Sequence, residues 1–411
     1  MEKIVITGMG TVNPLGVGVE ESWKNVVGGV SGVAPITLFD PASLNVHFAA
    51  EVKNFNPDQF MDSKEARRRD RFEQLGAAAA KMAIVDSGLE ITEANAGRVG
   101  VLVSSAIGGL KSLSDAVITN FTEGPRRVSP FLIPMLMPNG AAGMVAIDCQ
   151  IKGPCFSVAS ACASGSDGIG MALLMLKAGM IDAAVAGGAE ATICSVGVAA
   201  FDRVGAMSRR NNDFSMAPQP FDKNRDGLVM GEGAAVIVLE RETDAKKRGA
   251  NILAELAGYG ATADAYHVTA PHETGAGGAA AMKMALDSAR ANADELGYIN
   301  AHGTGTPLND QSETRAVKSA FGERAYQIPI SSTKSMTGHM MGATGALEVI
   351  FCVQALREGI LPPTIHYQTP DPECDLDYIP NQAREKKIEL AISNAFGFGG
   401  HNSVLALRRY S

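Results

Sequence analysis

The sequence predicts an α/β fold in which parallel sheets are covered on both faces by helices. Short β-branched runs end directly in glycine-rich turns, and Ala/Leu/Met-rich stretches with helical spacing lie between them. Strands are expected at residues 4–7, 99–104, 183–186, 235–239, 298–301, 328–331 and 390–394, and the clearest helices at 72–85, 165–177, 279–291 and 346–356. Strands that alternate with helices favour parallel pairing, because each crossover between parallel strands needs a helix.

The chain has 411 residues, which is more than one hydrophobic core usually serves, so two domains or two fused halves are expected. The charged segment 240–251 has the composition of a junction, and a second series of strand–turn–helix units follows it. We therefore predict an N-terminal half over residues 1–250 and a C-terminal half over residues 251–411.

Composition narrows the class of protein and its location. The formal net charge of -8 argues against nucleic acid as the main partner. The N-terminal residues do not have the pattern of a signal peptide, and no apolar run is long and glycine-poor enough to span a bilayer, so no membrane association is expected. The six cysteines form no CxxC pair, which favours free thiols and a cytoplasmic location.

Three motifs resemble cofactor-binding or ion-binding motifs, but each lacks a residue that the binding motif requires. Gly8 and Gly10 follow the first strand as in a dinucleotide fingerprint, but Asn13 takes the third glycine position, so a tight turn is the better interpretation. The segment 222–227 imitates a calcium loop whose twelfth position is Gly233 instead of glutamate. The glycines of 338–345 are not followed by Lys-Ser/Thr, and the histidines and cysteines never fall at zinc spacing, so no metal is expected.

Cys162 is the first candidate for catalysis. It stands among small residues where a predicted strand turns into a helix, so a substrate carbonyl could approach it. Free amides and the macrodipole at a helix N-terminus stabilise a thiolate, and we expect them to lower the pKa of Cys162. The alternative for a single cysteine is a buried small hydrophobe, and by itself the motif favours that alternative.

Two histidines stand in glycine-rich turns of the second half. His302 follows a predicted strand in the segment 300–307, and His339 lies in the segment 331–348 with Lys334 before it and Glu348 after it. A histidine in a Gly/Thr turn is not packed on a helix face, so a purely structural role is less favoured here. The motifs around Cys162, His302 and His339 are each weak evidence for catalysis alone. Their occurrence together in one chain is specific evidence for a catalytic site.

These residues resemble the beta-ketoacyl-[acyl-carrier-protein] synthases of the thiolase superfamily, most closely those that elongate chains in bacterial fatty acid synthesis. The resemblance covers essentially the whole chain and includes residues 221–227, 231–233 and 394–400. It implies a thiolase-like five-layered αβαβα fold, with two similar halves that each contain a mixed sheet. The N-terminal half would carry the nucleophilic cysteine, and the C-terminal half the His-His-Lys set.

The resemblance also implies a reaction and a role for each residue. Cys162 would accept the acyl group, His302 and His339 would be the paired histidines, and Phe398 would gate the acyl pocket. Lys334 would be either a proton-handling residue or half of a buried ion pair with Glu348. The activity would be decarboxylative Claisen condensation with malonyl-acyl carrier protein in fatty acid elongation. No cofactor is expected, since the phosphopantetheine arrives on the acyl carrier protein, and the family implies a homodimer.

Each predicted substrate-binding residue also has a structural interpretation. Thr304 and Thr306 are expected to hydrogen-bond the pantetheine arm, and the alternative is capping of the turn at Pro307. The expected lining of the acyl channel is Ile107, Phe201 and Phe398, and the alternative for these residues is ordinary core.

Basic residues predict a docking surface for the acidic acyl carrier protein. On a continuous helix Lys64, Arg67, Arg68 and Arg71 would share one face, and Arg126, Arg127 and Arg203 could assist them. The alternative is a solvated face. Two residues depart from the family pattern: His401 stands where threonine is usual, and Gly205 stands where a basic residue is frequent.

Four other functions compete with the condensing enzyme. A polyketide-type ketosynthase would use the same Cys-His-His set on other acyl chains. A degradative thiolase would carry a second catalytic cysteine near the C-terminus, and no cysteine follows Cys374. A non-catalytic chain-length partner would have lost Cys162. An NAD-dependent oxidoreductase is the competing enzyme of a different class.

Overall fold

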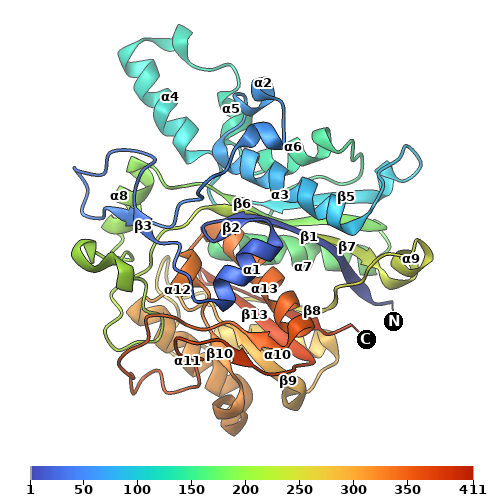
Figure 1. Ribbon diagram of the computed structural model, residues 1–411, viewed down its shortest axis with the longest axis vertical. Helices are drawn as coiled ribbons and strands as arrows, with labels where there is room; N and C mark the ends of the chain where they lie inside the picture. Colours follow the sequence, from blue (N-terminus) through green and yellow to red (C-terminus); the bar gives the residue numbers. More distant parts are fainter. Residues whose placement is uncertain (1, 411) are drawn as a thin grey trace.

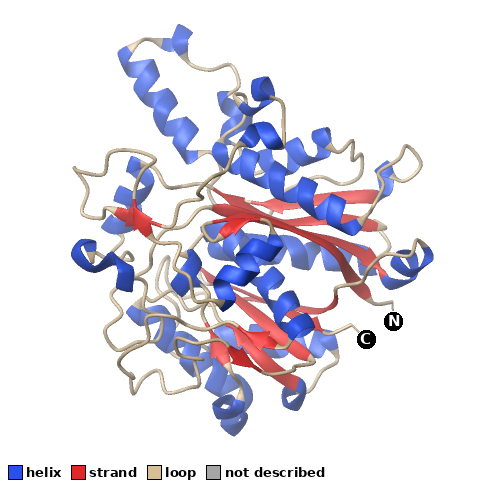
Figure 2. Ribbon diagram, in the orientation of Figure 1, coloured by secondary structure: helices blue, strands red, loops and turns tan. Residues whose placement is uncertain are grey.

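The computed structural model describes residues 2–410 and is built in five layers (Figure 1). One half of the sheet lies under an outer layer of helices, and the other half lies above a second outer layer, with further helices between the two halves (Figure 2). The outer helices are α3 (Arg71–Ser87) and α6 (Gly140–Asp148) on one side and α10 (Ala276–Ala289) and α11 (Pro307–Phe321) on the other, and the central ones are α7 (Ser164–Lys177) and α13 (Thr344–Glu358).

The main strands form one hydrogen-bonded path in the order β10-β9-β13-β14-β8-β1-β7-β6-β5. Their bounds are β1 (Ile4–Asn13), β5 (Val99–Ser104), β6 (Ala183–Glu190) and β7 (Gly233–Arg241) in the first half, and β8 (Ala254–Ala263), β9 (Leu296–Asn300), β10 (Ile330–Ser331), β13 (Leu390–Gly397) and β14 (His401–Arg408) in the second. Along this path the halves meet at a two-residue antiparallel ladder between β1 and β8, at Val5↔Glu255 and Ile6↔Ala254. The isolated bridge Met230↔His339 links them away from this path.

Shorter elements complete the chain. The remaining helices are α1 (Val19–Val27), α2 (Ser63–Ala66), α4 (Leu110–Thr122), α5 (Leu132–Leu136), α8 (Ser195–Arg203), α9 (Glu242–Lys247) and α12 (Lys334–Thr337). The two-residue strands are β2 (Gly16–Val17), β3 (Ala34–Pro35), β4 (Phe48–Ala49), β11 (Ile360–Leu361) and β12 (Arg384–Glu385). No helix within residues 2–410 combines the length and the apolar character that crossing a bilayer requires.

The pairing is mixed, so the expectation of purely parallel sheets from strand–helix alternation is wrong. β5 pairs parallel to β6, and β9 pairs parallel to β13 and β10. β7 returns antiparallel between β1 and β6, and β14 does the same between β8 and β13. A strand buried on both faces is apolar throughout in either arrangement, so composition does not distinguish the two. The mixed sheet in each half, which the family resemblance implies, is confirmed.

The two halves repeat one topology. In the first half, β1 pairs antiparallel to β7, β7 pairs antiparallel to β6, and β6 pairs parallel to β5. In the second half, β8 pairs antiparallel to β14, β14 pairs antiparallel to β13, and β13 pairs parallel to β9. The isolated parallel bridge Val101↔Cys155 occupies in the first half the place that β10 has in the second. The predicted boundary at residue 250 falls in the connection between α9 and β8, and its exact position stays a prediction.

Glycines in the first strand of each half bring a helix close to the sheet. A Cβ on Gly8 or Gly10 would lie 2.2 Å from a backbone oxygen of α3, and a Cβ on Gly258 or Gly260 would lie 2.2 Å from a backbone oxygen of α10. Gly8 and Gly10 are therefore inside β1 and not in the tight turn that the sequence suggested. Their function is close helix–strand packing.

Candidate active site

Cys162 sits in a short 3-10 turn (Ala161–Ala163) directly before α7. Ala161 has a φ of 51°, a left-handed conformation that is costly for a residue with a Cβ, so the surroundings must hold this turn in place. Three residues later, a Cβ on Gly165 would lie 2.6 Å from the carbonyl oxygen of Gly342. The cysteine turn therefore packs directly against the turn that follows His339, although the two are far apart in sequence.

His302 follows β9 and is held through its backbone. The amides of His302 and Gly303 donate to the carboxylate of Glu313 on α11, at 2.8 and 2.7 Å. The side chain of Asn394 also donates to this carboxylate, at 3.0 Å. A φ of 39° at Gly303 allows the chain to turn sharply after the histidine. Glu313 was not predicted as a site residue.

His339 follows α12 and the turn at Gly338. Its amide donates to the carbonyl oxygen of Val229 at 2.7 Å, which ties this second-half turn to the first half. Its ring Nδ1 lies 3.1 Å from the Thr344 hydroxyl, on the first turn of α13. This contact fixes the orientation of the imidazole.

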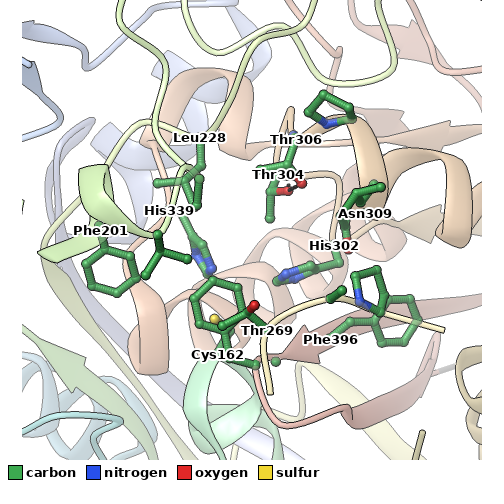
Figure 3. A pocket seen from close by; sticks show the side chains of 18 of the residues that line it. Cys162, Phe201, Leu228, Thr269, His302, Thr304, Thr306, Asn309, His339 and Phe396 are labelled. Atoms are coloured by element: carbon green, nitrogen blue, oxygen red, sulfur yellow. Dashed lines mark hydrogen bonds between the residues drawn. The ribbon is translucent and has the colours of Figure 1, made fainter. Parts of the chain in front are cut away.

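The structure brings the three candidate catalytic side chains together. The sulfur of Cys162 and one ring nitrogen from each of His302 and His339 all lie within 4.8 Å of one another. The two imidazoles meet nearly edge to face, with ring centroids 5.2 Å apart and an interplanar angle of 83°. Figure 3 shows Cys162, His302 and His339 converging on one space, with Thr304 and Thr306 on the side opposite the cysteine. The predicted meeting of three distant segments is present in the fold.

Burial makes both histidines neutral at physiological pH. Desolvation lowers the pKa of His302 well below its ordinary value, and the nearby charges of Lys334 and His339 lower it further. Desolvation and the charge of Lys334 lower the pKa of His339 in the same direction. A neutral imidazole carries one N–H donor and one lone pair, so each ring is able to donate to a developing oxyanion or accept a proton.

The thiol of Cys162 behaves differently from the sequence expectation. Burial raises its pKa to about 11, and this outweighs the lowering effects of the Phe398 amide, the charge of Lys334 and the cysteine's own amide. The negative charge of Glu190 adds to the increase. The expectation of a lowered pKa is therefore wrong, because α7 begins at Ser164 and its dipole acts on a sulfur that is almost completely removed from water.

This pKa predicts how alkylation of Cys162 depends on pH. The thiolate is the reactive form, so its alkylation by iodoacetamide should accelerate about tenfold per pH unit at every pH below the thiol pKa. With a pKa of about 11 the rate should still be rising past the ordinary cysteine value of 9.0. Peptide mass spectrometry at Cys162 gives the rate, with Cys162→Ser protein as the background. A plateau in the neutral range would contradict the raised pKa.

Lys334 and Glu348 form the predicted ion pair. The Lys334 ammonium lies 2.5 Å from Oε1 of Glu348, and both side chains are only 1% exposed. Burial raises the pKa of the Glu348 carboxyl to about 7 despite the opposing charge of Lys334. Removing one partner of such a pair leaves an uncompensated buried charge, which typically costs about 3–5 kcal/mol. Lys334 does not line the cavity at Cys162 and acts on the histidines through its charge.

Phe398 contributes both a backbone donor and a ring. Its amide points at the sulfur of Cys162 and lowers the thiol pKa. A Cβ on the preceding Gly397 would lie 3.1 Å from the Cys162 nitrogen, so the two backbones are in close contact. The Phe398 ring stacks on Phe201 of α8, with centroids 6.4 Å apart. These contacts place two N–H donors, those of Cys162 and Phe398, beside the sulfur.

A cavity of about 290 Å³ reaches the cysteine and the histidines. The predicted residues that line it are Cys162, Phe201, His302, Thr304, Thr306, His339 and Phe398. The hydroxyls of Thr304 and Thr306 are 2.9 Å apart. Thr306 makes no side-chain cap on α11, whereas the Thr304 hydroxyl accepts from the Thr306 amide at 3.3 Å, as the turn-capping alternative describes. Ile107 is partly buried and does not line this cavity, so its place in an acyl channel stays a prediction.

Four polar residues at the cavity were missed by sequence reasoning. Thr269 and Asn309 line it (Figure 3), and so do Asp264 and Asn402. The Asn402 side chain donates to Asp264 at 2.7 Å, which joins the start of β14 to the loop after β8. Common polar residues in loops and at strand ends give no periodic signal, so only the fold identifies them.

The predicted basic face at residues 64–71 is only partly correct. α2 ends at Ala66 and α3 begins at Arg71, so no continuous helix aligns Lys64, Arg67, Arg68 and Arg71. Arg71 instead forms a 2.6 Å ion pair with the buried Glu232. Lys64 and Arg67 are exposed, and Arg68 is partly exposed beside Glu65 and over the Phe131 ring. Arg126, Arg127 and Arg203 are also exposed.

The two departures from the family pattern lie near the cavity. His401 opens β14 and is exposed, and its Nε2 would lie 3.1 Å from a Cβ on Gly399. Gly205 lines the cavity with a φ of 78°. A φ in this range strains any residue that carries a Cβ.

Comparison with known proteins gives the family. Residues 1–245 match the model of the beta-ketoacyl synthase N-terminal domain, and residues 253–368 match that of the C-terminal domain. The chain belongs to the beta-ketoacyl synthase family. It is 47% identical over 409 residues to the 3-oxoacyl-[acyl-carrier-protein] synthase 2 of Staphylococcus aureus strain COL, covering 100% of this chain and 99% of the relative. It is 46% identical over 409 residues to the same enzyme of Synechocystis, with coverage of 100% and 98%.

Solved ketosynthase structures share the fold along the whole chain. A beta-ketoacyl synthase from Burkholderia phymatum superposes with a TM-score of 0.92 at 36% identity, and the ishigamide ketosynthase/chain length factor with 0.93 at 35%; both cover 100% of each chain. A type II polyketide ketosynthase bound to its acyl-carrier protein gives 0.92 at 34% identity with the same coverage. This beta-ketoacyl synthase is therefore a condensing acyltransferase with the thiolase-like fold, and it acts in acyl chain elongation. The oxidoreductase alternative is not retained.

Proposed function

We propose that Cys162 carries the growing acyl group while His302 and His339 together activate a malonyl thioester, in the elongation of fatty acids on acyl carrier protein. The observation that supports this most strongly is the buried thiol facing two neutral imidazoles in one cavity. Thr304 and Thr306 line the same cavity and would hydrogen-bond the pantetheine arm that delivers each substrate.

The first half-reaction transfers the acyl group to the enzyme. The sulfur of Cys162 attacks the thioester carbonyl of the acyl carrier, and the thiol proton passes to a neighbouring neutral imidazole. The amides of Cys162 and Phe398 stabilise the tetrahedral oxyanion, and one such donor is typically worth about 3–4 kcal/mol. Collapse of the intermediate breaks the bond to the carrier's sulfur, and that thiolate takes up the proton.

The second half-reaction forms the new carbon–carbon bond. The malonyl thioester loses CO₂, and its carbonyl becomes an enolate oxygen that accepts N–H bonds from His302 and His339. If the Thr344 hydroxyl donates to Nδ1 of His339, the ring proton sits on Nε2 as the donor to the enolate. The enolate carbon attacks the acyl group on Cys162, and the C–S bond breaks. The released cysteine thiolate takes up one proton from water, which is the proton that the overall reaction consumes. The product is a 3-oxoacyl thioester on the carrier.

These steps balance without a metal or redox cofactor, so we propose that the enzyme requires none. Lys334 would act through its charge: together with burial it keeps both imidazoles neutral, while Glu348 compensates the ammonium. Phe398 would cover the acyl pocket, since its ring stacks on Phe201 at the cavity wall.

Carrier docking is proposed at the exposed basic residues Lys64, Arg67 and Arg68, with Arg126, Arg127 and Arg203. Reversing two of these charges in the Lys64→Glu/Arg68→Glu protein should raise the KM for carrier-bound substrate by about tenfold at low salt, because surface charges chiefly affect the association of oppositely charged partners. The KM for a small thioester such as an acyl-pantetheine should stay unchanged. Steady-state kinetics with both substrates is the measurement.

A matched control for this experiment is Lys283→Glu. Lys283 is an exposed lysine on α10, in the opposite outer layer of the molecule. This substitution changes the net charge without touching the proposed surface. Equal changes in KM for the carrier-bound and the small substrate would contradict the docking proposal.

We also propose a homodimer in the cytoplasm. Large apolar side chains are exposed on α4 and α5, whose ribbons lie at the top of Figure 1. Phe121 is 91% exposed, and the exposed Val117 and Ile118 share its helix α4. Ile133 on α5 is exposed as well. Exposed apolar residues gathered on neighbouring elements are typical of a protein interface, and a second copy of the chain would cover them.

A polyketide-type ketosynthase is the second candidate, favoured by the likeness to polyketide ketosynthases over the whole chain. The curated relatives with higher identity are fatty acid enzymes, which supports the first candidate. The two differ in the product of repeated condensation. When the enzyme is incubated with carrier-bound substrates and no reductase, a single 3-oxoacyl product supports the elongating enzyme, and poly-3-oxo chains support the polyketide enzyme.

A further inference from the structure

Glu190 is a buried carboxylate that the proposed mechanism does not use. It ends β6, is completely buried and does not line the cavity. Burying a carboxylate is costly unless hydrogen bonds or a cation compensate it. Glu190 is compensated by four hydrogen-bond donors from two separate segments, so its surroundings were built around this side chain.

Three of the donors belong to the loop after β5. Oε1 of Glu190 accepts from the Ser105 hydroxyl at 2.8 Å, and Oε2 accepts from the Ala106 amide at 2.8 Å. The Ile107 amide also donates to this carboxylate. The Ser105 oxygen in turn accepts from the Gly108 amide at 2.9 Å. Glu190 thus fixes the whole turn that carries Ile107, the residue expected in the acyl channel, and that leads into α4.

The fourth donor belongs to the turn after His339. The amide of Gly342 donates to Oε2 of Glu190 at 3.1 Å. A Cβ on Gly342 would lie 2.9 Å from this oxygen and 2.6 Å from the Ala106 nitrogen, so only glycine allows the approach. The carbonyl of Gly342 lies against Gly165, three residues after Cys162. One carboxylate therefore lies where the acyl-channel loop, the histidine turn and the cysteine turn meet.

We propose that Glu190 is a positioning residue that holds the loop 105–108 in register with the turns of His339 and Cys162, so that the enolate reaches the carbonyl of a bound acyl chain. This inference rests on the proposed function. Glu313, Thr344 and Val229 hold the histidines independently of Glu190, so decarboxylation survives its loss. What is lost is the alignment of the acyl chain, and an enolate that misses its target is protonated and leaves as an acetyl thioester.

The test is Glu190→Gln, because the amide has nearly the same shape and turns an N–H group toward the donors. We expect the ratio of 3-oxoacyl product to CO₂ to fall from near one to below one half with an eight-carbon acyl group, and to fall less with a two-carbon group that does not reach the loop. The rate of condensation should fall at least tenfold, with the KM for malonyl-acyl carrier protein changed less than threefold. Glu190→Asp retains the carboxylate and should recover part of the ratio.

Glu73→Gln is the matched control, since Glu73 is another completely buried acidic side chain of the same half, and its carboxyl oxygen accepts from the Asp70 amide. It should lower the melting temperature and leave the ratio near one. Ser105→Ala removes a single donor and serves if Glu190→Gln does not fold. A ratio near one for Glu190→Gln, or for Ser105→Ala in its place, would overturn the inference, whereas a wild-type enzyme that makes no 3-oxoacyl product would overturn the proposed function instead.

Discussion

Replacing Cys162 with alanine will abolish the acyl-enzyme and lower condensation at least about a thousandfold, the scale expected when a covalent nucleophile is removed. The Cys162 sulfur is the group proposed to hold the acyl chain between the two half-reactions, and alanine has no atom that could replace it. Decarboxylation of the malonyl thioester should continue, because it requires only the histidines. Single-turnover assays with labelled acyl and malonyl carriers measure the two steps separately.

Cys155→Ala is the control for this substitution. Cys155 is exposed, is not among the residues that line the cavity and lies in the same half of the chain. It should retain both half-reactions at wild-type rates. Condensation by the Cys162→Ala protein at the wild-type rate would remove the nucleophile from the mechanism.

Replacing His302 or His339 with alanine will lower malonyl decarboxylation about 10²–10³-fold, since each removes one donor to the enolate. Acyl transfer to Cys162 should fall much less in either single variant, because the amides of Cys162 and Phe398 and one imidazole that accepts the thiol proton remain. Release of labelled CO₂ measures the first step, and intact-protein mass spectrometry measures the second. The double variant should lose little more than either single variant, since groups that act as a unit are not additive.

His47→Ala is the control, because it removes a partly buried imidazole that lies in the first half and is not part of the site. The His47 ring contacts the Leu44 carbonyl oxygen. It should leave decarboxylation unchanged. Wild-type decarboxylation by both histidine variants, together with a loss of acyl transfer, would reverse the roles assigned here.

Local sequence was sufficient for the turns that carry the chemistry. Cys162, His302 and His339 each follow a strand or precede a helix in a run of small residues, and such positions place a side chain at the end of a sheet. The Lys334–Glu348 ion pair could also be predicted from local sequence, because both residues belong to one continuous segment. The strands at 99–104 and 390–394 were also located, as was every predicted helix within a few residues.

The strands β8 and β14 were missed because their composition is not that of strands. Gly258 and Gly260 interrupt β8, and the reason is the α10 backbone that passes over them, which is a tertiary contact. β14 begins in the polar residues His401 and Asn402, and Asn402 lines the cavity. Without these two strands the antiparallel part of the second half could not be predicted.

Two predictions about the site, the pKa of Cys162 and the set of site residues, were wrong or incomplete for one reason. Both depend on burial, which cannot be inferred from local sequence. The pKa of Cys162 is raised because the sulfur is enclosed by segments from both halves. Glu313 and Glu190 are ordinary acidic residues in the sequence, and only the fold turns them into acceptors for backbone amides at His302 and in the turn after β5. The basic segment 64–71 is not one helix, because α2 ends at Ala66 and Asp70 caps the start of α3. Arg71 then pairs with the buried Glu232.

The central claim is that one sulfur carries the acyl chain and passes it to a carbon nucleophile made beside it. Pulse–chase mass spectrometry of the intact protein tests this most directly. Wild-type enzyme given an acyl carrier should gain the mass of one acyl group, located at the peptide containing Cys162, and a chase with malonyl carrier should remove that mass as the 3-oxoacyl product appears. An acyl group found on another residue, or one that the malonyl carrier does not discharge, would contradict the account.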